Sequence, residues 1–248
     1  MKRNLRKIMS VLIVLTLLLP LGGACAAGLE EVANGDAPPA EDANLVEATP
    51  SMEFKDVSPD DWFYSHVVNG VRFGIIKGTG DGRFEPNRNV TRAEFITMLG
   101  RLHEYGNETI GTPGVGAFYE RYLDWAVEMG IIHGNEHGDL MPHAYVTREQ
   151  MAVIAFRYID VVGLWRYVEC IDGPTIPVFF QDENITSRWA RTAIETLGEM
   201  RLLAYNPEFH ANYFRPRTDA TRADTLAQLA IIASRIYCQN TRGEYNIS

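Results

Sequence analysis

Three arginines of this chain stand in the same local context: Arg92 in "NVTRAEF", Arg148 in "YVTREQM" and Arg222 in "DATRADT". A guanidinium presents a planar, two-pronged set of donors that suits a carboxylate or a phosphate. Free backbone N–H groups at a helix start attract the same ions. The pattern fits an anion-binding role, and it fits equally well an intramolecular pair with a neighbouring Asp or Glu. The sequence leaves both interpretations open.

The residues around these arginines predict that each one begins a helix. A threonine followed three residues later by an acid or an amide is typical of a capping box. The pairs are Thr91 with Glu94, Thr147 with Gln150 and Thr221 with Asp224, and apolar residues at helical spacing follow each pair. An arginine in the first turn opposes the helix dipole at a cost of roughly 0.3 kcal/mol. Because this penalty recurs, we expect the arginines to have a compensating role.

Each arginine lies in one copy of a repeated helix–loop–helix unit. At one constant offset Pro86 aligns with Pro142, Thr91 with Thr147, and "GIIKG" with "GIIHG". A third copy is less regular and places Trp189 where Trp62 stands. We place the units at residues 54–106, 115–163 and 178–240, and we predict a mainly α fold.

The segment before the repeats predicts export. Residues 1–27 combine a basic head, an apolar run and the small residues of "ACAAG", which is the pattern of a signal peptide. Lipidation of Cys25 is a less favoured alternative. Residues 28–53 are acidic, rich in proline and without aromatic residues, so we expect a disordered spacer. No later stretch reaches the roughly 18 apolar residues of a membrane span.

The charge balance argues against nucleic acid or anionic lipid as the main partner. The whole chain carries −9, and the mature chain would carry −13, because residues 1–27 contain four basic and no acidic side chains. An anionic ligand would have to be held by local donors. The two cysteines that would remain, Cys170 and Cys238, could pair outside the cell, but their separation is not readable from sequence.

Phe54 and Asp56 in "FKD", Trp62, "GIIKGTGDGRFEPN" and "VTRAE" together resemble the S-layer homology repeat. The resemblance covers roughly residues 54–238. It implies a pseudo-threefold arrangement in which one helix from each repeat joins a central three-helix bundle. It also implies non-covalent anchoring to secondary cell-wall polysaccharide, commonly bearing pyruvate ketals, and hence a secreted protein located in the cell wall.

The resemblance assigns the acidic sugar to the repeated arginine, in grooves between neighbouring repeats. We therefore expect Arg92, Arg148 and Arg222 to bind it. Around them we expect a second cation at Lys77, whose counterpart in the second copy is His133, and a flat apolar face from Trp62. We also expect Gly78 and Gly134 to let the backbone approach the sugar closely. The second copy has Phe118 in place of Trp62 and His133 in place of Lys77, and the third has Tyr205 in place of Gly78. These departures rank the first copy above the second and the third, so Arg92→Ala should weaken wall binding more than Arg222→Ala.

Other functions are less well supported by the residues. Asp81 and Glu85 do not have the spacing of an EF-hand loop. A zinc site from His133, His137, His143 and Glu136 is a weak alternative without catalytic spacing. No nucleophile elbow, Walker loop or dinucleotide fingerprint occurs. We therefore expect no cofactor, no metal and no enzymatic activity. A membrane-to-wall tether lipidated at Cys25 and a protein–protein interaction module stay as alternative functions.

Overall fold

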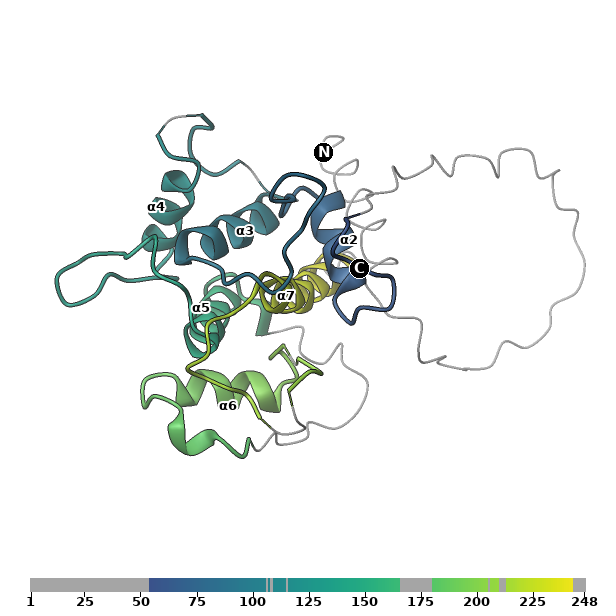
Figure 1. Ribbon diagram of the computed structural model, residues 1–248. Helices are drawn as coiled ribbons and strands as arrows, with labels where there is room; N and C mark the ends of the chain where they lie inside the picture. Colours follow the sequence, from purple (N-terminus) through teal and green to yellow (C-terminus); the bar gives the residue numbers. More distant parts are fainter. Residues whose placement is uncertain are drawn as a thin grey trace, which may run out of the picture.

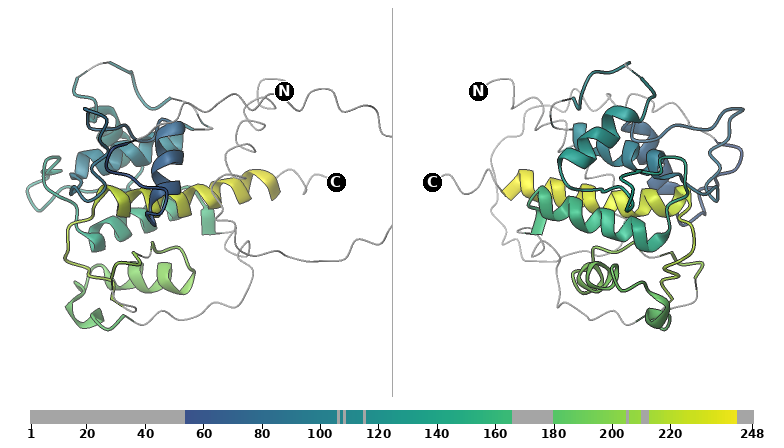
Figure 2. Two further views of the ribbon diagram at one scale, coloured as in Figure 1. Left: turned by 45° about the vertical axis from the view of Figure 1, so that its right-hand side comes forward. Right: turned by 90° about the vertical axis from the view of Figure 1, so that its left-hand side faces the viewer.

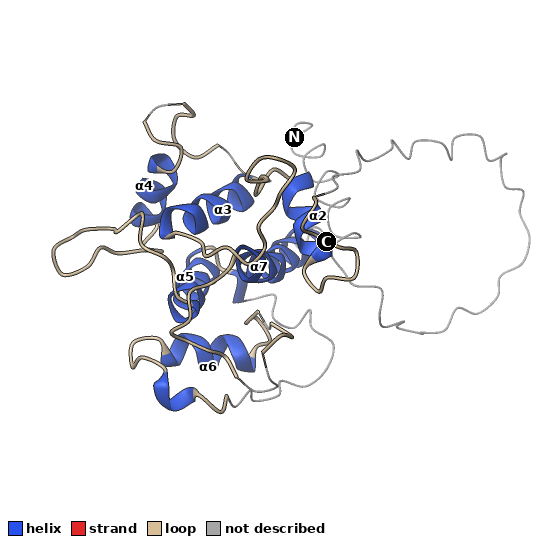
Figure 3. Cartoon of the chain, viewed as in Figure 1, coloured by secondary structure: helices blue, strands red, loops and turns tan. Residues whose placement is uncertain are grey.

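The computed structural model describes residues 54–165 and 180–242, except 106, 108, 115, 205 and 210–212. Within this range the chain is helical and contains no strand (Figure 3). The helices are α2 (Tyr64–Arg72), α3 (Arg92–Glu104), α4 (Glu120–Glu128), α5 (Arg148–Val161), η2 (Glu183–Ile185), α6 (Arg191–Glu199) and α7 (Arg222–Arg242). The prediction of a mainly α fold is confirmed. The predicted signal peptide, the acidic spacer, Cys170 and the side chain of Cys238 lie outside the described residues.

Two kinds of helix alternate along the chain. In α3 and α5 apolar side chains are buried around most of the circumference, and Phe95, Ile96 and Leu99 of α3 are fully buried. A helix that is apolar on most sides belongs to a core. By contrast α2, α4 and α6 bury a single face, such as Tyr122, Leu123 and Ala126 in α4. The capped helices therefore form the interior, and the helix that opens each repeat lies outside them.

Each outer helix packs on the inner helix of a different repeat. Helix α4 packs on α3, α6 packs on α5, and α2, from the first repeat, packs on α7 at the other end of the chain (Figures 1 and 2). Glycines allow two of these approaches. A Cβ on Gly100 would lie 2.3 Å from the ring of Tyr122, and one on Gly70 would lie 2.6 Å from Leu226. The repeats are therefore interlocked, and the last one packs against the first.

A ring of backbone hydrogen bonds joins the three segments that lead into the inner helices. Val90 N–H donates to Ala220 O (3.0 Å), Ala220 N–H to Val146 O (2.8 Å), and Val146 N–H to Val90 O (3.0 Å). These residues occupy equivalent positions directly before the capping threonines. The ring closes only when all three repeats are present. A pseudo-threefold arrangement of the complete repeats stays a prediction.

The first outer helix, α2, begins at Tyr64 and ends at Arg72. Gly74 follows with a φ of 69°, a left-handed conformation that favours glycine and ends helices. Trp62 and Ile75 therefore lie in the turns that flank the helix.

Candidate functional site

The three helix starts carry reciprocal cap hydrogen bonds. Thr91 Oγ1 accepts from the Glu94 N–H (3.3 Å), and the Thr91 N–H donates to the Glu94 carboxylate (2.9 Å). The corresponding distances are 3.3 and 3.1 Å for Thr147 with Gln150, and 3.1 and 3.0 Å for Thr221 with Asp224. This arrangement fixes where each arginine side chain leaves its helix.

The first two N–H groups of each inner helix are already used. Arg92 N–H donates to Ala144 O (2.9 Å), and Ala93 N–H donates to Pro142 O (3.0 Å), both in the loop of the next repeat. Helix α5 is held in the same way by the third loop, and α7 by the first loop through Pro86 and Arg88. The expectation that these N–H groups help to bind an anion is therefore wrong, because neighbouring carbonyls satisfy them.

Arg92 lies in an open cleft of about 520 Å³ that all three repeats contribute to. The second repeat supplies the loop with His133 and Gly134, and the third supplies Trp189. Trp189 is 57% exposed, and Tyr145, on the same cleft, is 55% exposed. Exposed rings beside a cation are suited to a sugar that carries a negative charge, since the ring stacks on the apolar face of the sugar and the cation pairs with the charge.

The guanidinium of Arg92 has spare donor capacity. Nη2 donates to His133 O (3.2 Å), whereas Nε is buried without a hydrogen-bond partner. No carboxylate among the described residues lies within ion-pair distance of Arg92. Burial lowers the pKa of Arg92, and the charge of Arg157 in the same cleft lowers it further. Two cations without a paired anion make this cleft a candidate anion site.

Arg148 is in a different situation. Its side chain is buried, its Nε donates to Phe214 O (2.8 Å), and its Nη1 lies 2.8 Å from Asp224 Oδ1. The guanidinium carbon also lies 5.1 Å from the ring centroid of Phe214 and 4.8 Å from that of Phe209. Burial lowers the pKa of Arg148, and the charge of Asp224 opposes this shift. Of the two interpretations left open by the sequence, the intramolecular pair describes Arg148.

Arg222 is intermediate between these two cases. It is 6% exposed, donates from Nε to Phe84 O (2.8 Å) and from Nη2 to Lys77 O (2.7 Å), and lies 4.5 Å from the Phe84 ring centroid. Burial lowers the pKa of Arg222 to about 10, with a further contribution from Arg88. It borders a cleft of about 510 Å³ together with Lys77, Gly78, Arg88, Glu94, Arg101 and Phe118.

The structure divides the expected site residues between two clefts. Lys77 and Gly78 border the cleft of Arg222, whereas His133 and Gly134 border the cleft of Arg92. Trp62 lies at neither cleft, and its Nε1 donates to Glu208 in the third loop (3.3 Å). The physical reason is the interlocking of the repeats, which places each arginine beside the loop of the following repeat.

Contacts within the protein explain why glycine stands at positions 78 and 134. A Cβ on Gly78 would lie 2.7 Å from the Phe54 ring, and one on Gly134 would lie 2.4 Å from the backbone of Gly138. Both distances are too short for any larger residue. The tight folding of each loop accounts for these glycines without a bound sugar.

Sequence reasoning missed three residues of the Arg92 cleft, namely Tyr145, Arg157 and Trp189. The alignment of Trp189 with Trp62 was a usable signal, because it marked an aromatic residue at a recurrent position. No comparable signal marked Arg157, which lies farther along helix α5, outside the motif.

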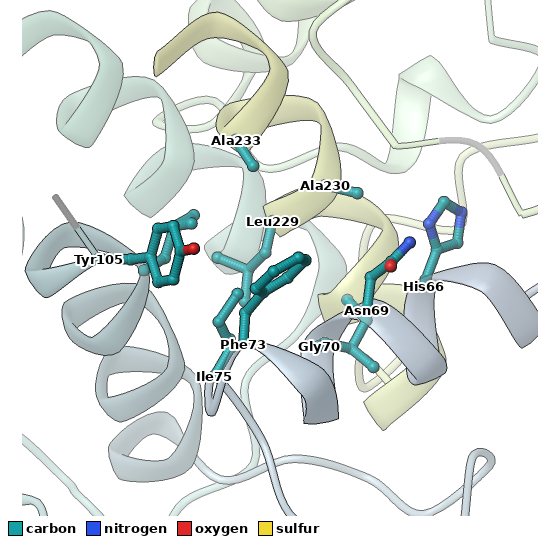
Figure 4. A pocket seen from close by; sticks show the side chains of 11 residues that line it. His66, Asn69, Gly70, Phe73, Ile75, Tyr105, Leu229, Ala230 and Ala233 are labelled. Atoms are coloured by element: carbon teal, nitrogen blue, oxygen red, sulfur yellow. The ribbon is translucent and has the colours of Figure 1, made fainter. Parts of the chain in front are cut away.

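A further pocket of about 230 Å³ borders the buried Arg148, and its lining includes Phe180, Leu203 and Phe214. A small apolar pocket of about 30 Å³ lies between α2, α3 and α7, lined by Phe73, Tyr105 and Leu229 among others (Figure 4). It has room for about one water molecule. Within the described ranges no group of three or more His, Cys, Asp or Glu side chains is placed to hold a metal ion. In the same ranges none of the helices has the length and apolar character needed to cross a bilayer.

Comparison with known proteins gives matches to cell-surface proteins and to enzymes. The chain is 32% identical over 178 residues to an amylopullulanase of Thermoanaerobacterium thermosulfurigenes, covering 70% of this chain. It is 32% identical over 152 residues to the surface-layer 125 kDa protein of Lysinibacillus sphaericus, covering 55% of this chain. It is 25% identical over 166 residues to a cellulosome-anchoring protein of Acetivibrio thermocellus, covering 64% of this chain.

The matched region is a small part of each relative. It spans 9% of the amylopullulanase, 13% of the surface-layer protein and 35% of the cellulosome-anchoring protein. The part these proteins share with the chain is therefore a module of a longer protein. A protein-family comparison matches two segments of the chain. Residues 53–96 and 112–152 of the chain match the S-layer homology domain.

Proposed function

We propose that this chain attaches to the bacterial cell surface by binding an acidic secondary cell-wall polysaccharide, without catalysis. The pyruvate ketal of such a polymer offers a carboxylate on a sugar ring. The S-layer homology matches support this proposal, as do relatives named as surface-layer and cellulosome-anchoring proteins. The enzymes among the relatives match over a small fraction of their length, so their names carry no argument for catalysis here.

The observation that carries the proposal is the setting of Arg92. Its guanidinium faces an open cleft of about 520 Å³, has no paired carboxylate, and lies with Arg157 among the exposed rings of Trp189 and Tyr145. A ketal carboxylate would accept hydrogen bonds from the guanidinium while the sugar stacks on a ring. Charge and shape therefore favour one ligand class, an anionic glycan.

The cleft of Arg222 is a second candidate site for the same polymer. It contains Lys77, Arg88 and Arg101, and the exposed ring of Phe118 is at its edge. Its acids, Glu85 and Glu94, already interact with Arg88 at 3.5 and 2.8 Å. We therefore propose weaker binding there than in the cleft of Arg92.

The test is co-sedimentation of the purified chain with wall polysaccharide before and after chemical removal of pyruvate. We expect retention by the native polymer, loss after depyruvylation, and loss with Arg92→Gln. Retention that is unchanged by both treatments would disprove the proposed ligand. Arg72→Gln, on the exposed side of α2 outside both clefts, is a control that should bind like the wild type.

A further inference from the structure

Each of the three arginines is brought together with the third helical residue of the next repeat, either as an ion pair or as a residue that lines the same cleft. Arg148 meets Asp224, at 2.8 Å. Arg222 shares its cleft with Glu94, and Arg92 shares its cleft with Gln150. These three partners occupy the same position, three residues after the capping threonine. The arginines are equivalent, but one partner is an aspartate, one a glutamate and one a neutral amide.

The state of each arginine follows from that partner. Asp224 neutralises Arg148, and the pair is buried. Glu94 pairs with Arg88 at 2.8 Å, and Arg222 donates to backbone carbonyls. Gln150 uses its Oε1 to cap Thr147 and offers Arg92 no charge. Arg92, whose partner position holds an amide, makes one hydrogen bond to the protein and pairs with no carboxylate of the described residues.

We infer that Gln150 is a specificity-determining residue of the Arg92 cleft, because its neutral amide leaves that guanidinium free for an external carboxylate. This inference rests on the proposed function, since it concerns the same anionic glycan. A carboxylate at position 150 acts as an internal competitor for the ligand. The residue type at this one position then separates a binding cleft from a structural ion pair.

Among the described residues that line the cleft, no Lys or Arg other than Arg92 and Arg157 could pair with such a carboxylate. In the first repeat Arg88 does this for Glu94, but the residue at the equivalent position of the second repeat is Ala144. The cations that line the cleft beside position 150 are Arg92 and Arg157, the two groups proposed to attract the ligand. An introduced carboxylate therefore pairs with the binding residues themselves.

The variant that tests the inference is Gln150→Glu. A glutamate at this helical position already forms a complete capping box in α3, so the variant keeps the cap and should fold. We expect its Kd for a pyruvylated oligosaccharide from the wall polymer to rise about tenfold or more. Calorimetric titration measures this change.

The matched control is Asn135→Asp, which adds the same charge at another residue that lines the same cleft. Asn135 Oδ1 accepts from the N–H groups of His137 (2.9 Å) and Asp139 (3.0 Å), and a carboxylate can do the same. We expect a much smaller rise in Kd. Equal losses in the two variants would show that overall charge, and not pairing at position 150, controls binding, and would overturn the inference.

A double-mutant cycle tests the pair without any ligand. We expect Gln150→Glu to raise the urea midpoint in low salt, and we expect this gain to shrink when Arg92→Gln is also present. An absent coupling, or undiminished oligosaccharide binding by Gln150→Glu, would overturn the inference. Failure of the wild type to bind the oligosaccharide would instead reject the proposed function, while the cycle still reports whether the pair forms.

Discussion

Arg148 Nη1 lies 2.8 Å from Asp224 Oδ1, and both side chains are 2% exposed. Asp224 Oδ1 also accepts from Asn206 Nδ2 (2.9 Å), while Oδ2 caps Thr221. One carboxylate thus joins the second repeat, the third loop and the start of α7. The sequence motif of Arg148 is compatible with ligand binding, but in the structure this arginine forms an ion pair that links two repeats.

Replacing Asp224 by Ala should be strongly destabilising. It removes the cap and leaves Arg148 as a buried cation without a counter-charge, which typically costs about 3–5 kcal/mol. Urea denaturation measures the loss. Gln150→Ala, which removes one hydrogen bond of the capping box, is the control and should cost about 1 kcal/mol. Similar losses in the two variants would contradict a stabilising role for the ion pair.

Arg92 and Arg222 should respond differently to replacement by Gln. Arg92→Gln should weaken polysaccharide binding by about tenfold or more, because a charge-assisted hydrogen bond contributes about 1.5–3 kcal/mol. Its free energy of unfolding should change little, since the guanidinium makes one hydrogen bond to protein, to His133 O.

Arg222→Gln should instead reduce the stability of the fold more than it reduces polysaccharide binding. It loses hydrogen bonds to Phe84 O and Lys77 O and a cation–π contact, so a loss of about 2 kcal/mol in stability is expected. Co-sedimentation and urea denaturation on the same preparations separate the two effects. Greater loss of binding with Arg222→Gln at unchanged stability would reverse the ranking of the clefts.

A chain that ends at residue 177 should not fold cooperatively. Without the third repeat, Val90 N–H loses Ala220 O, Arg148 N–H loses Thr218 O, and α3 and α5 lose their contacts with α7. Thermal unfolding followed by circular dichroism should show a broad transition or none. A sharp transition near the wild-type midpoint would mean that the first two repeats form an independent unit.

Acid should destabilise the fold partly through Glu94. Burial raises the pKa of this carboxyl, but the hydrogen bond and charge of Arg88 and the Thr91 N–H lower it more, so it lies below its ordinary value of 4.5. A pKa that is lower in the folded state gives stability that is complete above the unfolded value. That stability is lost as the pH falls through the folded value.

The urea midpoint should therefore fall below about pH 4.5, and it should fall less steeply in Glu94→Gln. Glutamine serves as the cap at the equivalent position in α5, so the variant keeps the helix start. Acid sensitivity that is identical in the two proteins would show that other carboxyl groups control it. Asp56 is the next candidate: burial raises its pKa, but the N–H groups of Phe84 and Glu85 lower it more.

The amino-acid sequence by itself determined the local structure of the helix starts. Thr91 and Glu94 are three residues apart, so their reciprocal hydrogen bonds depend on a single turn of backbone. The same holds for the helical character of α3 and α5, which follows from apolar spacing. Interactions of this kind involve neighbours in the chain, and sequence patterns report them directly.

Only the tertiary structure decided which residues share a cleft. Gln150 and Arg92 are 58 positions apart in the numbering, and Arg222 meets the carbonyl of Lys77 across 145 positions. Alignment of the repeats shows that the arginines are equivalent, but it does not show which loop each one faces. Because each outer helix packs on another repeat's inner helix, three copies of one motif produce one buried ion pair, one arginine held by carbonyls and one guanidinium that pairs with no carboxylate of the described residues.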